Sequence, residues 1–359
     1  MMDIIIAIGF HTTAFMLLMG VLLTVHEWGH YYAARIIGVS ASDFAIGIGP
    51  TIWSHQDHDG CTWHIKLLPI GGYVKFHGGK GSERNERERF DTRSPGDRAF
   101  VIAAGPALNL LFGMILIASL YAINGKPYIP PVISGVESGT PADIAGIQPG
   151  DEIISINGMR TTDFADIVDE VSLHPLGELD ILILRDGKEL EISVTAQQTS
   201  VDTMGRQQTV GRIGIQASNE IEYHPVEVSE ALMIGAEDVY KLTRGSVIAI
   251  SQIMSGQRSI QEMGGPVRIA EMSGAALGID FRMFILLMAV ISINLGVMNL
   301  LPIPILDGGQ LIICIVESIQ GRPVGNRALA YMHQVSALFL ILFIIGMTFN
   351  DMVNLMIKI

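Results

Sequence analysis

The chain has 359 residues, of which 49% are hydrophobic and 16% are charged, and its formal net charge at pH 7 is −13. Soluble domains carry roughly 25% charged residues, so this composition excludes an ordinary soluble enzyme and favours a membrane protein. An acidic chain offers no broad basic surface for nucleic acid, and we expect no such partner.

Four stretches lack Asp, Glu, Lys and Arg over a length that can cross a bilayer core about 30 Å thick. They are residues 4–25, 99–125, 283–306 and 328–350. We therefore predict a polytopic α-helical membrane protein that has four transmembrane helices and contacts the lipid bilayer along them. The corresponding segments are 1–34, 99–125, 281–318 and 328–350.

The first span ends in His26-Glu27-Trp28-Gly29-His30, which has the His-Glu-x-x-His spacing of zinc sites. Residues four apart stack on one helix face, so both imidazoles can bind one ion, and Glu27 can reach a metal-bound water. The alternative is an accidental pair, but two His and a Glu at the end of a lipid span are costly unless they have a function. A cleaved signal peptide is the alternative for the span itself, but "MMDIII" has no basic start and no small-residue cleavage site follows.

Basic residues are unevenly distributed between the connections. Residues 35–98 contain 9 Lys and Arg, and the short 307–327 connection adds Arg322 and Arg327. Residues 122–280 contain 10 Lys and Arg against 23 Asp and Glu. Because basic connections face the cytoplasm, we expect 122–280 and both termini to be extracytoplasmic. The His-Glu-x-x-His motif then lies near the cytoplasmic face.

The cytoplasmic segment 35–98 is predicted to begin with a β-hairpin region. Short alternating runs separated by Gly-Pro, Asp-Gly and Gly-Gly turns indicate strands at 44–48, 62–68 and 73–76. This region either associates with the membrane and offers a strand edge, or forms a soluble sheet. Residues 81–98 are predicted to be a charged linker.

The segment between the second and third spans is predicted to hold a folded module and then interfacial helices. Residues 127–218 indicate an inserted α+β domain with helices at 141–145 and 163–173, a strand at 151–157 and a hairpin at 179–194. Its stretch "SGTPADIAGIQPGDEIISINGMRTTDFADI" resembles a PDZ domain, which implies binding of a peptide or carboxyl terminus as an added strand. Residues 219–280 are expected to form amphipathic helices at the outer membrane boundary.

A catalytic zinc site needs a third protein ligand, and few acids lie near membrane depth. Asp307 ends the stretch "NLLPIPILD", and Asn299 lies eight residues before it. Pro302 and Pro304 prevent a regular helix between them, and membranes tolerate irregular backbone only beside protein or a water-filled cavity. Asp307 is therefore the candidate ligand, and the alternative is that it belongs to a simple helix-ending turn.

Together, "HEWGH", "GPALN", "NLLPIPILDGG" and the PDZ-like insertion resemble the site-2 protease family, and most of all the bacterial regulator-of-sigma-E proteases. The stretches "GIGP", "PIGGYVKF" and "GGPVRIA" extend the resemblance nearly end to end. It implies an intramembrane zinc metalloprotease of the bacterial inner membrane. The implied substrates are single-span proteins such as anti-sigma factors, cut after a first cleavage at site 1, and signal-peptide remnants.

The resemblance also implies a role for individual residues. His26, His30 and Asp307 would bind Zn²⁺, and Glu27 would be the general base. Asn299 would hold the substrate backbone or the developing oxyanion. Asn109, Gly71, Gly72 and Tyr73 would hold the extended substrate. Trp28 departs from the smaller aromatic residue usual in the family, and one PDZ module is expected where some relatives have two.

Two other classes of protein explain fewer features of the sequence. A catalytically silent membrane scaffold could bind peptides through the PDZ-like module, but it leaves Glu27 beside two histidines unexplained. A metal transporter would need polar residues that continue across the membrane, whereas here they gather towards one side.

Overall fold

The computed structural model describes residues 2–77, 88–202, 207–218, 222–259 and 264–358. The chain divides into two compact units. One comprises Met1–Ala118, Leu232–Ser246 and Gly264–Ile357, and the other comprises Ser119–Ala231, Val247–Met263 and Lys358–Ile359. Of the expected charged linker 81–98, residues 81–87 lie outside the described part of the chain.

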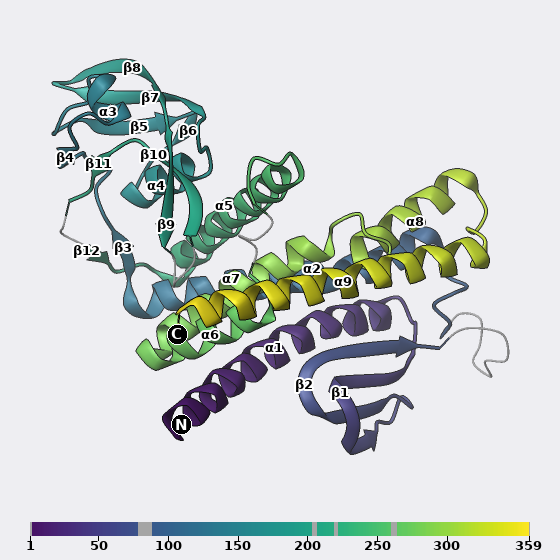
Figure 1. Ribbon diagram of the computed structural model, residues 1–359. Coiled ribbons are helices and arrows are strands. Elements are labelled where there is room, and N and C mark those ends of the chain that lie inside the picture. The colour runs from purple at the N-terminus through teal and green to yellow at the C-terminus, as the bar shows by residue number, and fades with distance from the viewer. Residues whose placement is uncertain (1, 78–87, 203–206, 219–221, 260–263, 359) are drawn as a thin grey trace. The chain divides into compact units, whose positions relative to one another are not determined.

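Four long apolar helices lie where the spans are predicted. They are α1 (Met2–Ile36), α2 (Pro95–Asn124), α7 (Phe281–Asn299) and α9 (Asn326–Lys358). Within the described residues, these four are long and apolar enough to cross a membrane. The first helix does not stop at the charge-free stretch but continues through the His-Glu-x-x-His motif to Ile36, so the motif is helical throughout (Figure 1).

Two further helices follow the second unit's sheets, namely α5 (Val228–Met254) and α6 (Pro266–Ile279). Neither is among the described helices that are long and apolar enough to span a membrane, and their position at the outer membrane boundary stays a prediction. Helix α6 packs on α1 and α7, and Ala276 of α6 belongs to the same buried cluster as Leu18 and Phe284. Small residues at such contacts let helices approach closely.

The chain between the third span and Asp307 is irregular, as the prolines predict. Helix α7 ends at Asn299 and α8 (Asp307–Gln320) begins at Asp307. A side chain at Gly308 or Gly309 would overlap backbone carbonyls of the preceding loop, so this loop folds tightly against the start of α8. Asp307 therefore begins a helix, and the alternative of a helix-ending turn is wrong.

Strands β1 (Ala41–Gln56) and β2 (Thr62–Phe76) form a bent sheet beside α1 (Figure 1). Residues 43–46 of β1 have partners on both sides: Phe44 pairs with Trp63 and also with Val74. The last part of β2, residues 72–76, is therefore paired on one side only and forms an edge of the sheet. All three predicted strands are present. Residues 44–48 lie in β1, and residues 62–68 and 73–76 both lie in β2.

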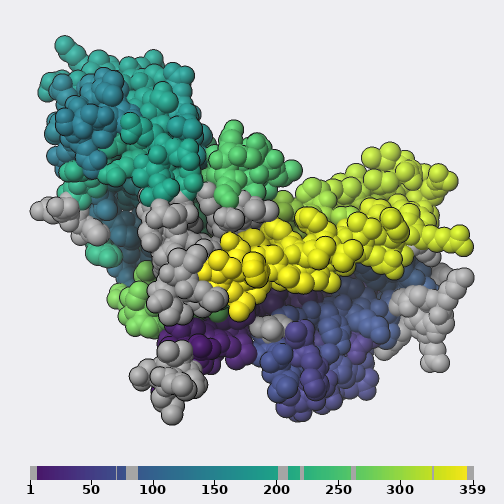
Figure 2. All heavy atoms as spheres, viewed as in Figure 1, coloured from purple at the N-terminus to yellow at the C-terminus, as the bar shows by residue number. Residues whose placement is uncertain are grey.

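The second unit contains a small α+β module, seen as a teal lobe in Figure 2. Its main sheet has the order β6-β5-β7-β8, and aliphatic residues such as Ile153, Ile181 and Ile183 form its core. Its elements are β3 (Lys126–Tyr128), β4 (Gly135–Val136), α3 (Pro141–Ile144), β5 (Glu152–Ile156), β6 (Met159–Arg160), α4 (Phe164–Ser172), β7 (Glu178–Arg185), β8 (Lys188–Thr195), β9 (Gln197–Asp202), β10 (Gln207–Arg212), β11 (Ile215–Gln216) and β12 (Glu222–His224). Both predicted helices, the strand and the hairpin are present.

A buried ion pair in this module predicts a pH-dependent stability. Burial alone would raise the pKa of Asp151, but hydrogen bonds from the Arg185 guanidinium and the Gln148 amide, together with the guanidinium charge, lower it below its usual 3.8. Both Arg185 contacts to the carboxylate measure 2.7 Å. A lowered pKa stabilises the fold above the unfolded value, and this stability is lost as the pH falls through the folded value.

We expect Asp151→Asn to lower the free energy of opening of this module by about 2 kcal/mol at neutral pH, because it removes charge-assisted hydrogen bonds. Hydrogen exchange of the β5 and β7 amides in the intact protein measures this change. The difference should shrink as the pH falls below 3.8 and through the lowered pKa of the folded Asp151 carboxylate. Asp180→Asn, at an exposed position, is the matched control. Equal exchange in all three proteins would contradict the prediction.

Candidate metal centre

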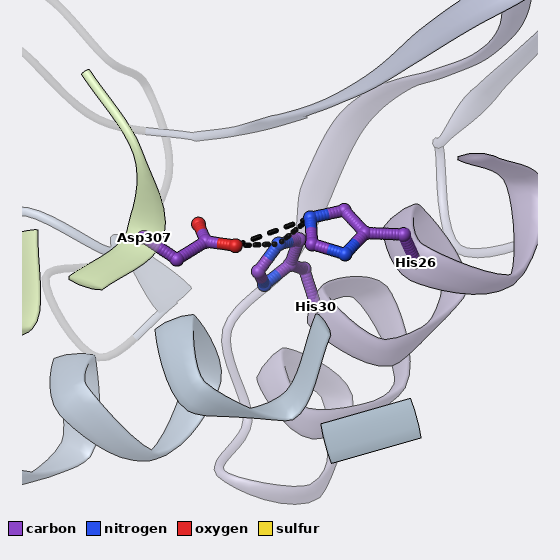
Figure 3. Close-up of side chains that lie close together, drawn as sticks. All are labelled: His26, His30 and Asp307. Atoms are coloured by element: carbon purple, nitrogen blue, oxygen red, sulfur yellow. Dashed lines mark hydrogen bonds and ion pairs between the residues drawn. The ribbon is translucent and has the colours of Figure 1, made fainter. Parts of the chain in front are cut away.

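The helix α1 brings two imidazole rings together on one face. His26 is buried and its Nε2 atom lies 3.1 Å from Nε2 of His30, four residues further on. This is the arrangement that the i, i+4 spacing predicts. Both rings direct their Nε2 atoms towards the same point (Figure 3).

Asp307 reaches the same point from the start of α8 (Figure 3). Its Oδ2 atom lies 3.1 Å from Nε2 of His26 and 3.5 Å from Nε2 of His30. A tetrahedral zinc ion with bonds of about 2 Å requires ligand atoms about 3.3 Å apart. The three side chains form a group of possible ligands whose atoms have the spacing and chemistry that zinc prefers.

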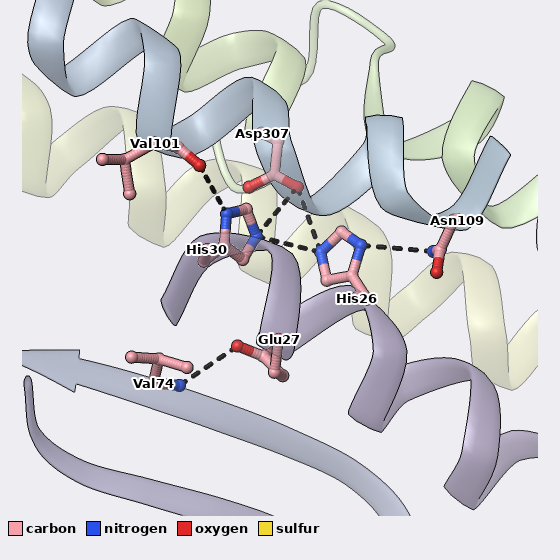
Figure 4. A network of polar contacts seen from close by, with 7 residues as sticks. All are labelled: His26, Glu27, His30, Val74, Val101, Asn109 and Asp307. Carbon is pink, nitrogen blue, oxygen red and sulfur yellow. Dashed lines mark hydrogen bonds and ion pairs between the residues drawn. The ribbon is translucent and has the colours of Figure 1, made fainter. Parts of the chain in front are cut away.

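The other nitrogen of each ring contacts α2. His30 Nδ1 lies 2.9 Å from the backbone oxygen of Val101, and His26 Nδ1 lies 3.2 Å from the side-chain amide of Asn109 (Figure 4). A carbonyl can only accept, so Nδ1 of His30 carries the proton and its Nε2 presents a lone pair. The side-chain oxygen of Asn109 has no other hydrogen-bond partner. If the amide is turned so that this oxygen accepts a hydrogen bond from His26, Nδ1 of His26 also carries the proton.

With both rings in this form, three acceptor atoms face one another. The two Nε2 lone pairs and Oδ2 of Asp307 then have no proton between them, and this buried Oδ2 has no hydrogen-bond donor. Acceptors held together in this way repel unless a cation lies among them. The contacts of the imidazole Nδ1 atoms are those that orient histidine ligands in metal sites. The residues present therefore fit a zinc ion.

Two glycines allow α1 and α2 to approach closely at this point. A side chain on Gly29 of α1 would overlap the backbone of Ala104, and one on Gly105 of α2 would overlap the ring of His30. A Cβ atom at Gly105 would also lie 3.0 Å from Cε1 of His26. Gly105 belongs to the stretch "GPALN" and leaves space for both imidazole rings. The stretch "GPALN" alone does not reveal this role.

Glu27 does not belong to the group of ligand atoms. Its Oε2 atom accepts a hydrogen bond of 3.1 Å from the backbone N–H of Val74 in β2. Figure 4 shows its carboxylate pointing towards that strand. The general base expected from the motif is thus held beside the metal centre by the sheet edge.

The other expected site residues are distributed over three elements. Asn299 is half buried at the end of α7, and Gly71 and Gly72 are half buried in β2, where Tyr73 is 39% exposed. Asn109 is fully buried against His26, which places it inside the helix bundle. The backbone groups of Val101 and Val74 were not predicted, because the amino-acid sequence carries no signal for a contact made by the main chain.

Known proteins are similar to nearly the whole of this chain. The model of Peptidase family M50 matches residues 14–343. A protein of Rickettsia conorii named as a zinc metalloprotease is 34% identical over 95% of this chain and 98% of its own. One of Agrobacterium fabrum with the same designation is 32% identical over 99% and 100%. Regulator of sigma E protease of Haemophilus influenzae is 26% identical over 95% and 98%.

The similarity extends over almost the whole chain and includes every residue of the metal centre. The chain therefore belongs to Peptidase family M50, the site-2 protease family, and is a zinc metallopeptidase. Its apolar helices and its family agree on a multi-pass membrane protein. The PDZ domain of an SdrC-like protein from Listeria monocytogenes aligns with 25% of this chain and 88% of its own at 20% identity, with a TM-score of 0.21.

Proposed function

We propose that this zinc metallopeptidase cuts single-span membrane proteins within the bilayer. The observation that supports this most strongly is a zinc-type donor set held by helices that are apolar enough to cross a membrane. A substrate that reaches such a site through lipid is itself a transmembrane segment. The name of the Haemophilus influenzae relative favours anti-sigma factors, already trimmed by a first protease, as substrates. Signal-peptide remnants are a second group with the same chemistry.

In this proposal, His26, His30 and Asp307 bind the zinc ion and Glu27 is the general base. Asn299 and the residues Gly71, Gly72 and Tyr73 hold the extended substrate or the developing oxyanion. For Asn109 we propose a role other than the one that the sequence resemblance implied. Because it is fully buried and contacts Nδ1 of His26, we assign it to orienting that ring.

A zinc ion bound by these residues would polarise the scissile carbonyl and lower the pKa of a water molecule towards about 7. Glu27 takes a proton from the attacking water as its oxygen bonds to the carbonyl carbon. The carboxyl group then gives a proton to the amide nitrogen as the C–N bond breaks. Val101 and Asn109 keep both imidazole rings in the orientation that this geometry needs.

The substrate must be unwound before this chemistry can begin, because a helix uses its own carbonyls in hydrogen bonds. Residues 72–76 of β2 pair with β1 on one side, and within the described part of the chain no strand pairs with them on the other. This edge supports strand addition as the means of unwinding. An extended segment that pairs with this edge receives hydrogen bonds in exchange for those it loses. The same edge adjoins Glu27, so the strand would lie beside the reacting groups.

Removing the metal tests the proposed function. We expect the purified full-length protein in detergent to cleave a single-span peptide, to lose this activity when a chelator removes zinc, and to regain it when zinc is added back. Electrophoresis and mass spectrometry of the products measure the cleavage. Cleavage that persists after the metal content has fallen to background would contradict the proposal.

We further propose that the protein resides in the bacterial inner membrane, with both termini and residues 127–218 extracytoplasmic and the metal centre near the cytoplasmic face. The module 127–218 is then a PDZ domain that filters substrates. It either excludes those with bulky outer portions or binds a newly exposed carboxyl terminus.

Deleting residues 127–218 from the full-length protein distinguishes these two roles. Exclusion predicts that the deletion increases cleavage of an untrimmed substrate and leaves a trimmed one unchanged. Capture predicts that cleavage of the trimmed substrate falls. Rates measured side by side on the two substrates decide between them. Unchanged rates on both would contradict the filter in either form.

A further inference from the structure

The hydrogen bond between Glu27 and Val74 occupies a position that a substrate strand would need. Residues 72–76 of β2 pair with β1 on one side only. Val74 directs its N–H away from β1 and into the Glu27 carboxylate, at 3.1 Å. In an antiparallel ladder, outward-facing N–H groups recur at every second residue, so Val74 is the donor at the centre of this edge.

Glu27 contacts the strand directly, without an intervening side chain. A Cβ atom at Gly72 would meet Cγ of Glu27 at 3.3 Å and the oxygen of Ala45 at 2.8 Å. The missing side chain at Gly72 therefore lets the glutamate lie along the strand. A carboxylate is a stronger acceptor than a peptide carbonyl, so it holds the donor until another acceptor displaces it.

We propose that Glu27 closes the edge of β2 in the free protein, and that a substrate carbonyl must take over the N–H of Val74 before Glu27 can act as a base. This inference rests on the proposed function. The exchange replaces one hydrogen bond by another and breaks no covalent bond. Its consequence is that the base is released only when an extended chain lies beside the metal centre. Val74 is thus a positioning residue that acts through Glu27.

The test compares variants that bind substrate without cutting it. Glu27→Ala leaves the Val74 N–H open, whereas Glu27→Gln keeps an oxygen acceptor beside it. The probe is a fluorescein-labelled single-span peptide of Leu and Ala with a central Ser-Gly-Ser, whose binding in detergent is measured by anisotropy. We expect Glu27→Ala to bind the peptide about tenfold more tightly than Glu27→Gln. The alanine variant has no side-chain oxygen that competes with the peptide for the N–H of Val74. Equal affinities would overturn the proposal.

Two changes at position 74 separate this effect from a general change of the site. Val74→Pro removes the donor, and proline is tolerated where the N–H faces away from the partner strand. Val74→Ala keeps the donor and is the matched control. The tenfold difference should persist with Val74→Ala and disappear with Val74→Pro. A difference that survives Val74→Pro would overturn the proposal.

Two further measurements keep the outcomes apart. If the wild-type protein fails to cleave the same peptide, the proposed function is contradicted. If the wild-type protein cleaves it but the two Glu27 variants bind it equally tightly, only the closed edge is contradicted. Hydrogen exchange of residues 72–76 in the free protein needs no proline variant. It should be faster in Glu27→Ala than in Glu27→Gln, and equal rates would remove the premise.

Discussion

Asp307→Asn and Glu27→Gln will both abolish peptide hydrolysis, but only the first will remove zinc. Asp307 contributes an oxygen to the donor set, whereas Glu27 lies outside it and bonds to Val74. Losing a general base costs about 10²–10⁴-fold in rate. Losing a ligand lowers metal affinity as well, and we expect His26→Ala and His30→Ala to behave like Asp307→Asn.

Zinc content by elemental analysis and cleavage of a single-span peptide, measured on the same preparations, distinguish the two groups. Glu237→Gln is the control, since Glu237 lies on the surface of α5 and pairs with Lys241. It should match the wild-type protein in both measurements. Full zinc content in the Asp307→Asn protein would mean that another residue is the third ligand. Activity retained in the Glu27→Gln protein would remove Glu27 as the base.

Gly105→Ala will damage the metal centre although no ligand is changed. The added methyl group would overlap the ring of His30 and press on His26, so the rings must turn away from Asp307. Changes that disturb the support of metal ligands cost about 10–100-fold in metal affinity or activity, and we expect a loss of this size. Chelator competition gives the zinc affinity, and peptide cleavage gives the activity.

Gly346→Ala is the matched control for this substitution. Gly346 also lies within an apolar helix, but a methyl group there would meet nothing within 4 Å. It should leave the metal affinity unchanged and stabilise α9 slightly, since alanine has the higher helix propensity. If Gly105→Ala binds zinc as tightly as Gly346→Ala does, the close approach of α1 and α2 does not support the centre.

Much of the arrangement was predictable because it depends on local periodicity. The four spans follow from runs without charge, and the pairing of His26 with His30 follows from helical spacing. The hairpin predicted at 179–194 turns at Asp186 and Gly187, and both residues have the positive φ angles that a tight turn requires, at 51° and 74°. The scarcity of acids near the spans made Asp307 the candidate for the third ligand.

The contacts around the ligands were not predictable, because they join segments far apart in the chain and several use the main chain. Val101 and Val74 contribute a carbonyl and an amide that every residue has, so only the folded structure selects them. The family resemblance implied that Asn109 holds the substrate. Asn109 lies one turn after Gly105 on α2, where its amide contacts His26. The sequence also could not show that Asp307 begins a helix.

The positions of the proposed ligands along the chain also determine when the centre can form during synthesis. His26 and His30 lie on the first apolar helix, whereas Asp307 follows the third. The ribosome delivers the chain from its N-terminus, so the histidines enter the membrane long before the aspartate has been translated. A nascent chain therefore lacks a complete centre. On the proposed function, the protease would become active only when its synthesis is nearly finished.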